Sequence, residues 1–439
     1  MLLPRDVVGQ CISEWRHDGV FTKIMVGNSI SEALVPYRYE NTEKHEQKQL
    51  TREAVRESFY RAFVNMTDEH LVWGSLVGVK PAKVASKLLA ELGTIEATMA
   101  TLQHKYHVSP QRAQLATQSA VSSQLLRETL PNNGVSLYIS IPFCPSRCSY
   151  CSFVSQSTER ENNLIEPYLA ALLRELECKS VIVKQNGQAV DNIYIGGGTP
   201  TVLTAAQLDI LLSNIATHFD LSVLREYTVE AGRPETCTAE RLRVLKAHGV
   251  TRLSINPQSM NQSVLDAIGR KHTVQDVYTA VDIARVIGCD VINMDIIAGL
   301  PGDTPDGFST SLDAVRCIAP ENITVHTMTK KRGAAVTEPV GDEKIVNAMT
   351  EYSIAALSNN YSPYYLYRQK FMATAAENIG WSMNGKDCAY NICMMDELCT
   401  VIGIGAGAAS KIHKIGGKIE RIANAKFPID YIRGLNHAN

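Results

Sequence analysis

Short apolar runs alternate with helical stretches across the middle of the chain. Runs the length of a single β-strand lie at residues 135–141, 191–195, 226–230, 251–255, 291–297 and 321–327. Between them lie five stretches in which apolar residues recur every three to four positions, as in an amphipathic helix: 163–180, 205–217, 238–247, 274–287 and 306–318. Strands and helices in this alternation predict a parallel sheet covered by helices.

Several of these strands carry polar residues on one face only. In residues 291–297, Asn293 and Asp295 share one face, and the apolar residues between them share the other. Residues 251–258 and 226–230 repeat this pattern. Strands covered on both sides in an open sheet are usually apolar on both faces, so a repeated polar face favours a barrel whose lumen holds a polar ligand. With about six strands, we predict an α/β fold with a partial (β/α)6 TIM-like barrel; an open doubly wound sheet is the alternative.

The flanking regions have different patterns. Helical periodicity from residue 51 to the turn-forming segment 131–134 predicts a mostly helical N-terminal domain over residues 1–130, in which residues 21–25 could form a strand. The barrel is expected over residues 131–335. Residues 336–439 are expected to form a small C-terminal module.

Composition narrows the class of protein. The 439 residues carry a net charge of −2 without a basic tail, so nucleic-acid binding has no electrostatic support. No apolar run approaches the roughly 18 residues needed to span a membrane. Eleven cysteines and a start unlike a secretory signal indicate the reducing cytoplasm, where thiolates stay available to bind metal.

Three of those cysteines form a compact motif directly after the first predicted strand. Cys144, Cys148 and Cys151 follow a CxxxCxxC pattern, and thiolates favour iron–sulfur clusters or zinc. Structural zinc sites commonly use two CxxC pairs, and a second pair is missing from the sequence. A four-iron cluster held by three cysteines would leave one iron open to a ligand. The glycine-rich turn 196–200 follows the second strand, where backbone amides could approach that ligand.

The combination of motifs resembles the radical S-adenosylmethionine (SAM) superfamily. The segments 138–144, 194–201 and 297–302 resemble its branch of oxygen-independent coproporphyrinogen III oxidases. A further set resembles coproporphyrinogen dehydrogenases of the HemZ type: 73–78, 228–234, 254–258, 268–273, 364–370 and 405–408.

The resemblance implies roles for individual residues. Cys144, Cys148 and Cys151 would hold a [4Fe–4S] cluster whose open iron binds SAM. The positions that would contact SAM are Tyr138, Tyr150, Gly197, Gly198, Thr199, Glu230, Gln258, Arg270 and Asp295. Among these, Glu230 and Asp295 would bind polar groups such as ribose hydroxyls, and Arg270 would pair with a carboxylate.

The resemblance also implies a reaction. A radical derived from SAM would abstract hydrogen from a propionate of coproporphyrinogen III, and loss of carbon dioxide and an electron would leave a vinyl group. Two such cycles give protoporphyrinogen IX, a step of haem biosynthesis. The implied partners are the porphyrinogen and a reducing protein such as flavodoxin or ferredoxin. Well-studied bacterial enzymes of this branch have a further cysteine where this chain has Phe153, and a histidine where it has Ser140. A haem-binding protein of the haem-chaperone type, or a radical SAM enzyme for another tetrapyrrole, therefore remains an alternative.

Two further groups invite weaker hypotheses. Cys388, Cys393 and Cys399 could hold a second cluster, although their spacing along a predicted helix places them on different faces. His326, at the end of the sixth strand, is a better candidate for function than His272.

Overall fold

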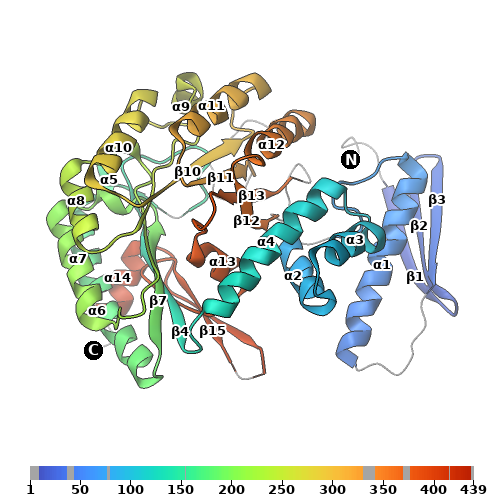
Figure 1. Ribbon diagram of the computed structural model, residues 1–439, viewed down its shortest axis with the longest axis horizontal. Helices are drawn as coiled ribbons and strands as arrows, with labels where there is room; N and C mark the ends of the chain where they lie inside the picture. Colours follow the sequence, from blue (N-terminus) through green and yellow to red (C-terminus); the bar gives the residue numbers. More distant parts are fainter. Residues whose placement is uncertain are drawn as a thin grey trace. The chain divides into compact units, whose positions relative to one another are not determined.

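The computed structural model describes residues 9–36, 44–76, 80–153, 155–329, 342–368, 376–414 and 416–436 (Figure 1). They fall into two compact units. The first contains the residues up to Ala120 together with Arg368, and the second contains the rest. The predicted boundary at residue 335 lies outside the described residues, as do parts of the motifs 73–78 and 364–370.

The first unit begins with an antiparallel sheet of β1 (Gly9–Arg16), β2 (Gly19–Val26) and β3 (Ser29–Pro36). Only residues 21–25 of this sheet were considered as a strand from the sequence. The two-residue loop Gly27–Asn28 joins β2 to β3, with Gly27 at a φ of +57°, as tight hairpins require. Helix α1 (Lys44–Thr67) packs on the sheet, where Ser58 Oγ and Thr22 Oγ1 lie 2.6 Å apart. The unit is therefore helical only after its first 36 residues.

Helices α2 (Pro81–Leu92), α3 (Ile95–Tyr106) and the first half of α4 (Pro110–Thr129) complete this unit. Trp73 is almost fully buried beside them. Arg368 belongs here because its guanidinium lies 5.9 Å from the Trp73 ring centre and its Nη1 donates to the Leu76 carbonyl at 3.2 Å. Residues distant in the sequence thus join one core.

The second unit is built on an eleven-stranded sheet. All six predicted strands are present, and they pair parallel with one another in the order β4 (Gly134–Ile141), β7 (Ala189–Gly197), β8 (Glu226–Glu230), β9 (Arg252–Ser254), β10 (Val291–Ala298) and β11 (Asn322–Thr327). The sheet ends in β12 (Ser362–Tyr367) on one side and β16 (Ile419–Ala423) on the other, so it stays open. The partial barrel predicted from the sequence is confirmed.

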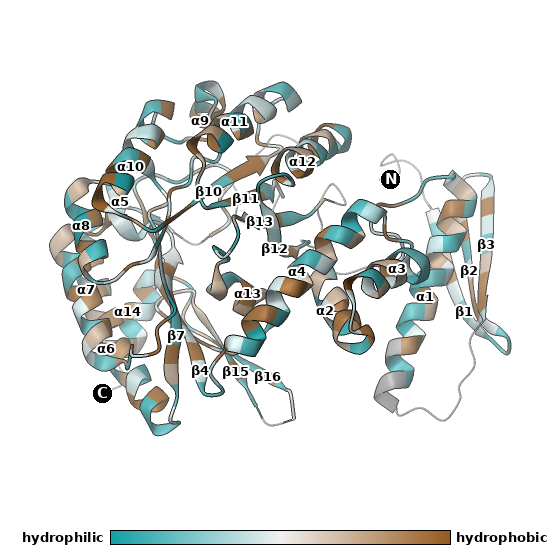
Figure 2. Cartoon of the chain, in the orientation of Figure 1, coloured by the Kyte–Doolittle hydropathy of each residue, from teal (hydrophilic) through white to brown (hydrophobic). Residues whose placement is uncertain are grey.

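Helices cover the outer face of this sheet, as Figure 1 shows for the arc from α6 to α11. They are α6 (Ile165–Gln185), α7 (Ala205–His218), α8 (Ala239–Ala247), α9 (Gln262–Ala267), α10 (Val274–Ile287) and α11 (Pro305–Ile318). Thr204 and Thr273 begin α7 and α10 with capping boxes. Figure 2 shows teal and brown alternating along these helices, as expected when each buries a single face. Shorter or later helices are α5 (Thr158–Glu161), α12 (Glu343–Leu357), α13 (Ala389–Asp396) and α14 (Pro428–Asn436).

The C-terminal residues, expected from the sequence to form a small module over 336–439, contribute strands to the barrel sheet. Strand β14 (Thr400–Ile404) runs parallel to β4 and extends the sheet through β15 (Ala409–His413) to β16. At the other edge, β13 (Asn378–Ser382) pairs antiparallel with β11. Backbone pairing with β4 and β11 therefore makes this region part of one sheet.

Within the described ranges, no helix has the length and apolar character that crossing a bilayer requires.

Candidate functional site

The cysteine motif lies in the loop after β4, beside the short strands β5 (Phe143–Cys144) and β6 (Gln156–Ser157). Thr199 Oγ1 donates to Cys144 Sγ at 3.5 Å. Burial raises the pKa of Cys151; the backbone of Phe153 opposes this rise, and the neighbouring Cys148 and Cys144 add to it. The three thiols therefore lie close enough to influence one another.

These thiols are not arranged around a single metal ion. Among the residues that the structure describes, no group of three or more His, Cys, Asp or Glu side chains could hold one ion. A cluster spaces its thiolate ligands more widely, because each binds a different iron. The donor set, three thiols without a fourth ligand, fits a four-iron cluster better than a zinc ion.

The glycine-rich turn at the end of β7 packs directly against this loop. Gly198 N donates to the Ile141 carbonyl at 2.9 Å, and Thr199 N donates to the Phe143 carbonyl at 2.7 Å. A Cβ on Gly198 would lie 2.5 Å from that Phe143 oxygen, and one on Gly197 would lie 2.7 Å from Ser140 Oγ. Only glycine fits at this close approach of the turn to the loop that carries the cysteines.

Glu230 ends β8 with its side chain on the inner face of the sheet. Tyr194 donates its hydroxyl hydrogen to Glu230 Oε1 at 2.6 Å, and a Cβ on Gly196 would contact the carboxyl carbon at 2.7 Å. Burial raises the pKa of Glu230 to about 7, and the charge of Asp295 adds to this rise. A carboxyl group whose ionisation is disfavoured in this way is typical of a functional site.

Asp295, on the inner face of β10, is held in the ionised form. Burial alone would raise its pKa, but His326, Asn293 and Thr324 lower it below its ordinary value. Asn293 Nδ2 donates to Asp295 Oδ1 at 2.8 Å, and His326 Nε2 lies 3.7 Å from Asp295 Oδ2. The inner face thus carries two carboxylates with different protonation behaviour, and His326 lies at the site.

Gln258 lies in the segment between β9 and α9, and Arg270 lies shortly after α9. Gln258 has a φ of +68°, and its buried side-chain oxygen has no hydrogen-bond partner. Arg270 Nη1 donates to the carbonyls of Asn256 at 2.5 Å and Gly232 at 3.3 Å, while Nη2 donates to the Tyr150 hydroxyl at 3.4 Å. The buried Gln258 oxygen is therefore free to accept a hydrogen bond from a water molecule or a ligand.

Tyr138 belongs to an aromatic cluster that the sequence did not predict. Its ring centre lies 6.3 Å from that of Tyr194 and 6.0 Å from that of Tyr390, and the last two are 4.5 Å apart. Tyr390 comes from α13, whose first amides, including the Tyr390 N–H, donate to the Glu226 carboxylate. Glu226 in turn pairs with buried Arg252 at 3.1 Å. Sequence patterns gave no sign of Tyr390, because it reaches the site from a distant segment.

Most predicted site residues belong to the carboxyl ends of the strands or the connections that follow them, where α/β barrels place their active sites. Tyr138 and Asp295 lie in the middle of β4 and β10. Direct contacts join Thr199 to Cys144, and Tyr150 to Arg270. Of the three cysteines in the second-cluster hypothesis, Cys388 Sγ donates to Glu226 Oε1 at 3.1 Å, and Cys399 Sγ lies 3.2 Å from Ser136 Oγ.

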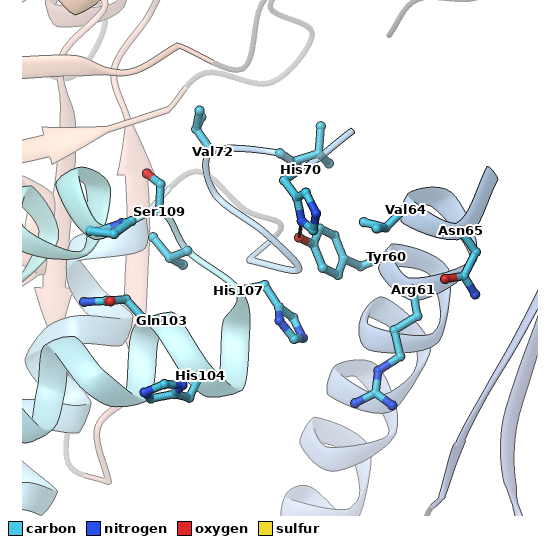
Figure 3. A pocket seen from close by; sticks show the side chains of 13 residues that line it. Tyr60, Arg61, Val64, Asn65, His70, Val72, Gln103, His104, His107 and Ser109 are labelled. Atoms are coloured by element: carbon cyan, nitrogen blue, oxygen red, sulfur yellow. Dashed lines mark hydrogen bonds between the residues drawn. The ribbon is translucent and has the colours of Figure 1, made fainter. Parts of the chain in front are cut away.

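A separate pocket of about 610 Å³ lies in the first unit (Figure 3). His107 faces Tyr60 there, with ring centres 4.9 Å apart, and its Nε2 lies 2.8 Å from Glu57 Oε1. Arg61 of α1 also bonds Glu57, at 2.7 Å. Both contacts end on Glu57 Oε1, while Glu57 Oε2 is buried without a hydrogen-bond partner among the described residues, and these contacts assign no ligand to the pocket.

Comparison with known proteins identifies the family. Residues 138–315 match the model of the radical SAM superfamily. The chain is 38% identical, over 90% of its length and 81% of the relative, to the oxygen-independent coproporphyrinogen-III oxidase-like protein HemZ of Bacillus subtilis. The chain belongs to this branch of the radical SAM superfamily.

Other members of the superfamily are also similar. The haem chaperone HemW of Lactococcus lactis is 33% identical over 62% of this chain and 69% of its own. The fold of the radical SAM coproporphyrinogen III oxidase HemN from Escherichia coli matches with a TM-score of 0.58, at 23% identity, over 73% of this chain and 72% of that one. Radical SAM proteins use a [4Fe–4S] cluster and SAM, and the three-thiol loop, the glycine turn and the unsatisfied Gln258 oxygen fit these cofactors.

Proposed function

We propose that this protein catalyses the oxygen-independent oxidative decarboxylation of coproporphyrinogen III to protoporphyrinogen IX. The observation that carries the proposal is the match along 90% of the chain to a coproporphyrinogen-III oxidase-like protein, together with the cysteine loop and the polar inner face. The chain's family membership supports the radical chemistry, and the porphyrinogen is the proposed substrate.

Each of the two reacting propionate side chains would become a vinyl group by losing carbon dioxide, one hydrogen atom and one electron. When bound, the reduced cluster and SAM supply the carbon radical that accepts the hydrogen atom. The electron passes to an external acceptor. Two such conversions account for the two vinyl groups of the product.

The chain's own residues would position and shield this chemistry. Cys144, Cys148 and Cys151 would hold the cluster, and the backbone of Gly197 and Gly198 would lie along the methionine part of SAM. The remaining contacts would come from the residues Tyr138, Tyr150, Thr199, Glu230, Gln258, Arg270 and Asp295. The tyrosine cluster around Tyr138 would keep water from the inner face.

A second candidate function is haem binding without turnover. Two observations favour it: the similarity to the haem chaperone HemW, and the exposed Phe153 at the position where well-studied oxidases of this branch have a further cysteine. A radical SAM enzyme that acts on another tetrapyrrole would share the same site.

The deciding experiment uses the full chain reconstituted anaerobically with iron and sulfide. The protein is given SAM, a reductant and coproporphyrinogen III, and the porphyrins and methionine are quantified. Protoporphyrin formed together with methionine supports the decarboxylase, and Cys144→Ala should abolish both. Methionine without loss of a propionate, combined with tight haem binding seen in the visible spectrum, would instead favour the second candidate.

The physiological partners are also proposals. A one-electron donor such as flavodoxin or ferredoxin would reduce the cluster. The cysteine-rich composition and the need for a reduced, oxygen-protected cluster support a cytoplasmic location. Replacing the chemical reductant with each purified donor would show which one sustains turnover.

A further inference from the structure

Arg233 is a buried cation in the loop after β8 that contacts two residues of the cysteine loop. Its Nη2 donates to the Ser146 carbonyl at 2.7 Å and to Cys148 Sγ at 3.0 Å. Only 2% of the residue is exposed. Its own carbonyl accepts from Thr236 N at 2.9 Å and Thr236 Oγ1 at 2.7 Å, which fixes the start of the 3₁₀ turn Pro234–Thr236. The guanidinium is therefore held against Cys148 by a rigid turn.

Carboxylates alone do not balance the charge of Arg233. The Glu235 Oε1 atom lies 3.8 Å from Nη1, and the Glu235 side chain is 26% exposed. Nη1 itself is buried without a hydrogen-bond partner. A buried cation is costly unless an anion or strong acceptor compensates it, and the Cys148 sulfur is the negatively polarised group in direct contact.

The other buried side chains nearby, His272 and Arg270, add no negative charge next to Arg233. His272 Nδ1 lies 3.6 Å from Glu235 Oε2. Burial, together with the charges of Arg270 and Arg233, lowers the pKa of His272 to about 3, so its ring is neutral. Arg270 is a second cation whose donors go to Asn256, Gly232 and Tyr150. The cysteine loop thus faces two buried guanidinium groups, and within the described part of the chain only that of Arg233 bonds a cysteine sulfur.

We propose that Arg233 is a positioning residue that donates a hydrogen bond to the Cys148 thiolate and raises the reduction potential of the cluster. Reduction adds one negative charge to the cluster, and a cation bonded to a ligand sulfur stabilises the more negative state. Hydrogen bonds to the sulfurs and local charge are known determinants of cluster potentials. The inference rests on the family's cluster and not on the porphyrinogen, so its failure would leave the proposed substrate untouched.

The test compares Arg233→Met with Arg243→Gln in the full-length, anaerobically reconstituted protein. Arg243 is an exposed arginine on α8, so its replacement changes net charge equally without touching the loop. An EPR-monitored redox titration gives the midpoint potential, and iron analysis gives cluster content. We expect R233M to lower the equilibrium constant for reduction about tenfold, which is about 59 mV for a one-electron couple, and R243Q to leave it unchanged. An R233M potential equal to that of the wild type, with the cluster retained, would overturn the proposal.

A second measurement covers the case in which R233M loses its cluster. Wild-type protein is labelled with ¹⁵N-arginine, and pulsed EPR of the reduced cluster measures coupling to guanidinium nitrogen. Arg233→Lys keeps the positive charge but carries no label at this position, so any coupling from Arg270 remains as an internal reference. A coupling that disappears in R233K supports the bond to Cys148. Identical spectra for the two proteins would show that Arg233 does not bond the cluster ligand.

Discussion

Replacing Glu230 with Gln removes one half-buried negative charge while keeping the shape of the site. Burial raises the pKa of Glu230 from 4.5 to about 7, with the charge of Asp295 adding to the rise; the Tyr194 hydroxyl, the Gly197 amide and His326 oppose it. The amide oxygen of Gln could still accept the hydrogen bond from Tyr194. The substitution therefore tests the cost of the charge itself.

The effect of this charge on the free energy of unfolding follows from the linkage between protonation of Glu230 and folding. At about 1.36 kcal/mol for each pH unit, the rise from 4.5 to about 7 means that ionised Glu230 destabilises the apoprotein by about 3 kcal/mol. Because the pKa is higher in the folded state, folding favours the protonated form. The penalty is therefore absent below the unfolded pKa, grows as the pH rises from 4.5 to 7, and is constant above 7.

We expect E230Q apoprotein to be more stable than wild type by about 3 kcal/mol at pH 8.5, and equally stable below pH 4.5. Urea unfolding of the full chain is monitored at each pH by the fluorescence of Trp381, which is fully buried in the second unit, with Trp15 and Trp73 replaced by Phe in every variant. The exposed Glu177 supplies a control substitution, E177Q, that removes the same charge away from the site. A stability difference that stays constant with pH, or that grows toward acid, would refute the argument.

Three further predictions concern the same unit. Arg252→Met should destabilise it by about 3–5 kcal/mol in the same unfolding assay, because Glu226 is left buried without its cation; a change below about 1 kcal/mol would contradict this. Gly198→Ala should abolish SAM binding in equilibrium dialysis, because the added Cβ would lie 2.5 Å from the Phe143 carbonyl oxygen. The control Gly434→Ala, whose Cβ would lie in open space on α14, should bind SAM normally. Asp295→Asn should weaken SAM binding at least about tenfold by calorimetry without reducing iron content, since one charged hydrogen bond is worth about 1.5–3 kcal/mol; unchanged affinity would exclude a contact.

The sequence predicted the barrel strands well because their signal is local. Each strand alternates polar and apolar residues or forms a short apolar run, and the helices between them bury one face, so both periods are visible without tertiary information. The expected strand at residues 291–297, for example, is β10 at Val291–Ala298. The N-terminal sheet was largely missed because β1 is exposed along its length and alternates weakly.

The candidate site was predicted in the same uneven way. The cysteine spacing and the glycine turn can be recognised in the sequence, because a few residues close together in the chain carry the chemistry. Arg233 and Tyr390 could not be predicted, because their importance depends on contacts with Cys148 and Tyr194 over long stretches of chain.

The sequence by itself determined which thiols, glycines and carboxylates are present, and the order in which the strands deliver them to one edge of a parallel sheet. The tertiary structure alone decided how those groups are charged and supported. Burial and distant partners give Glu230 and Asp295 opposite pKa shifts, although both are carboxylates on strand faces of the same pattern. The pairing of β14 with β4 likewise joins the C-terminal residues to the barrel, because backbone hydrogen bonds between strands far apart in the chain leave no local trace in the sequence.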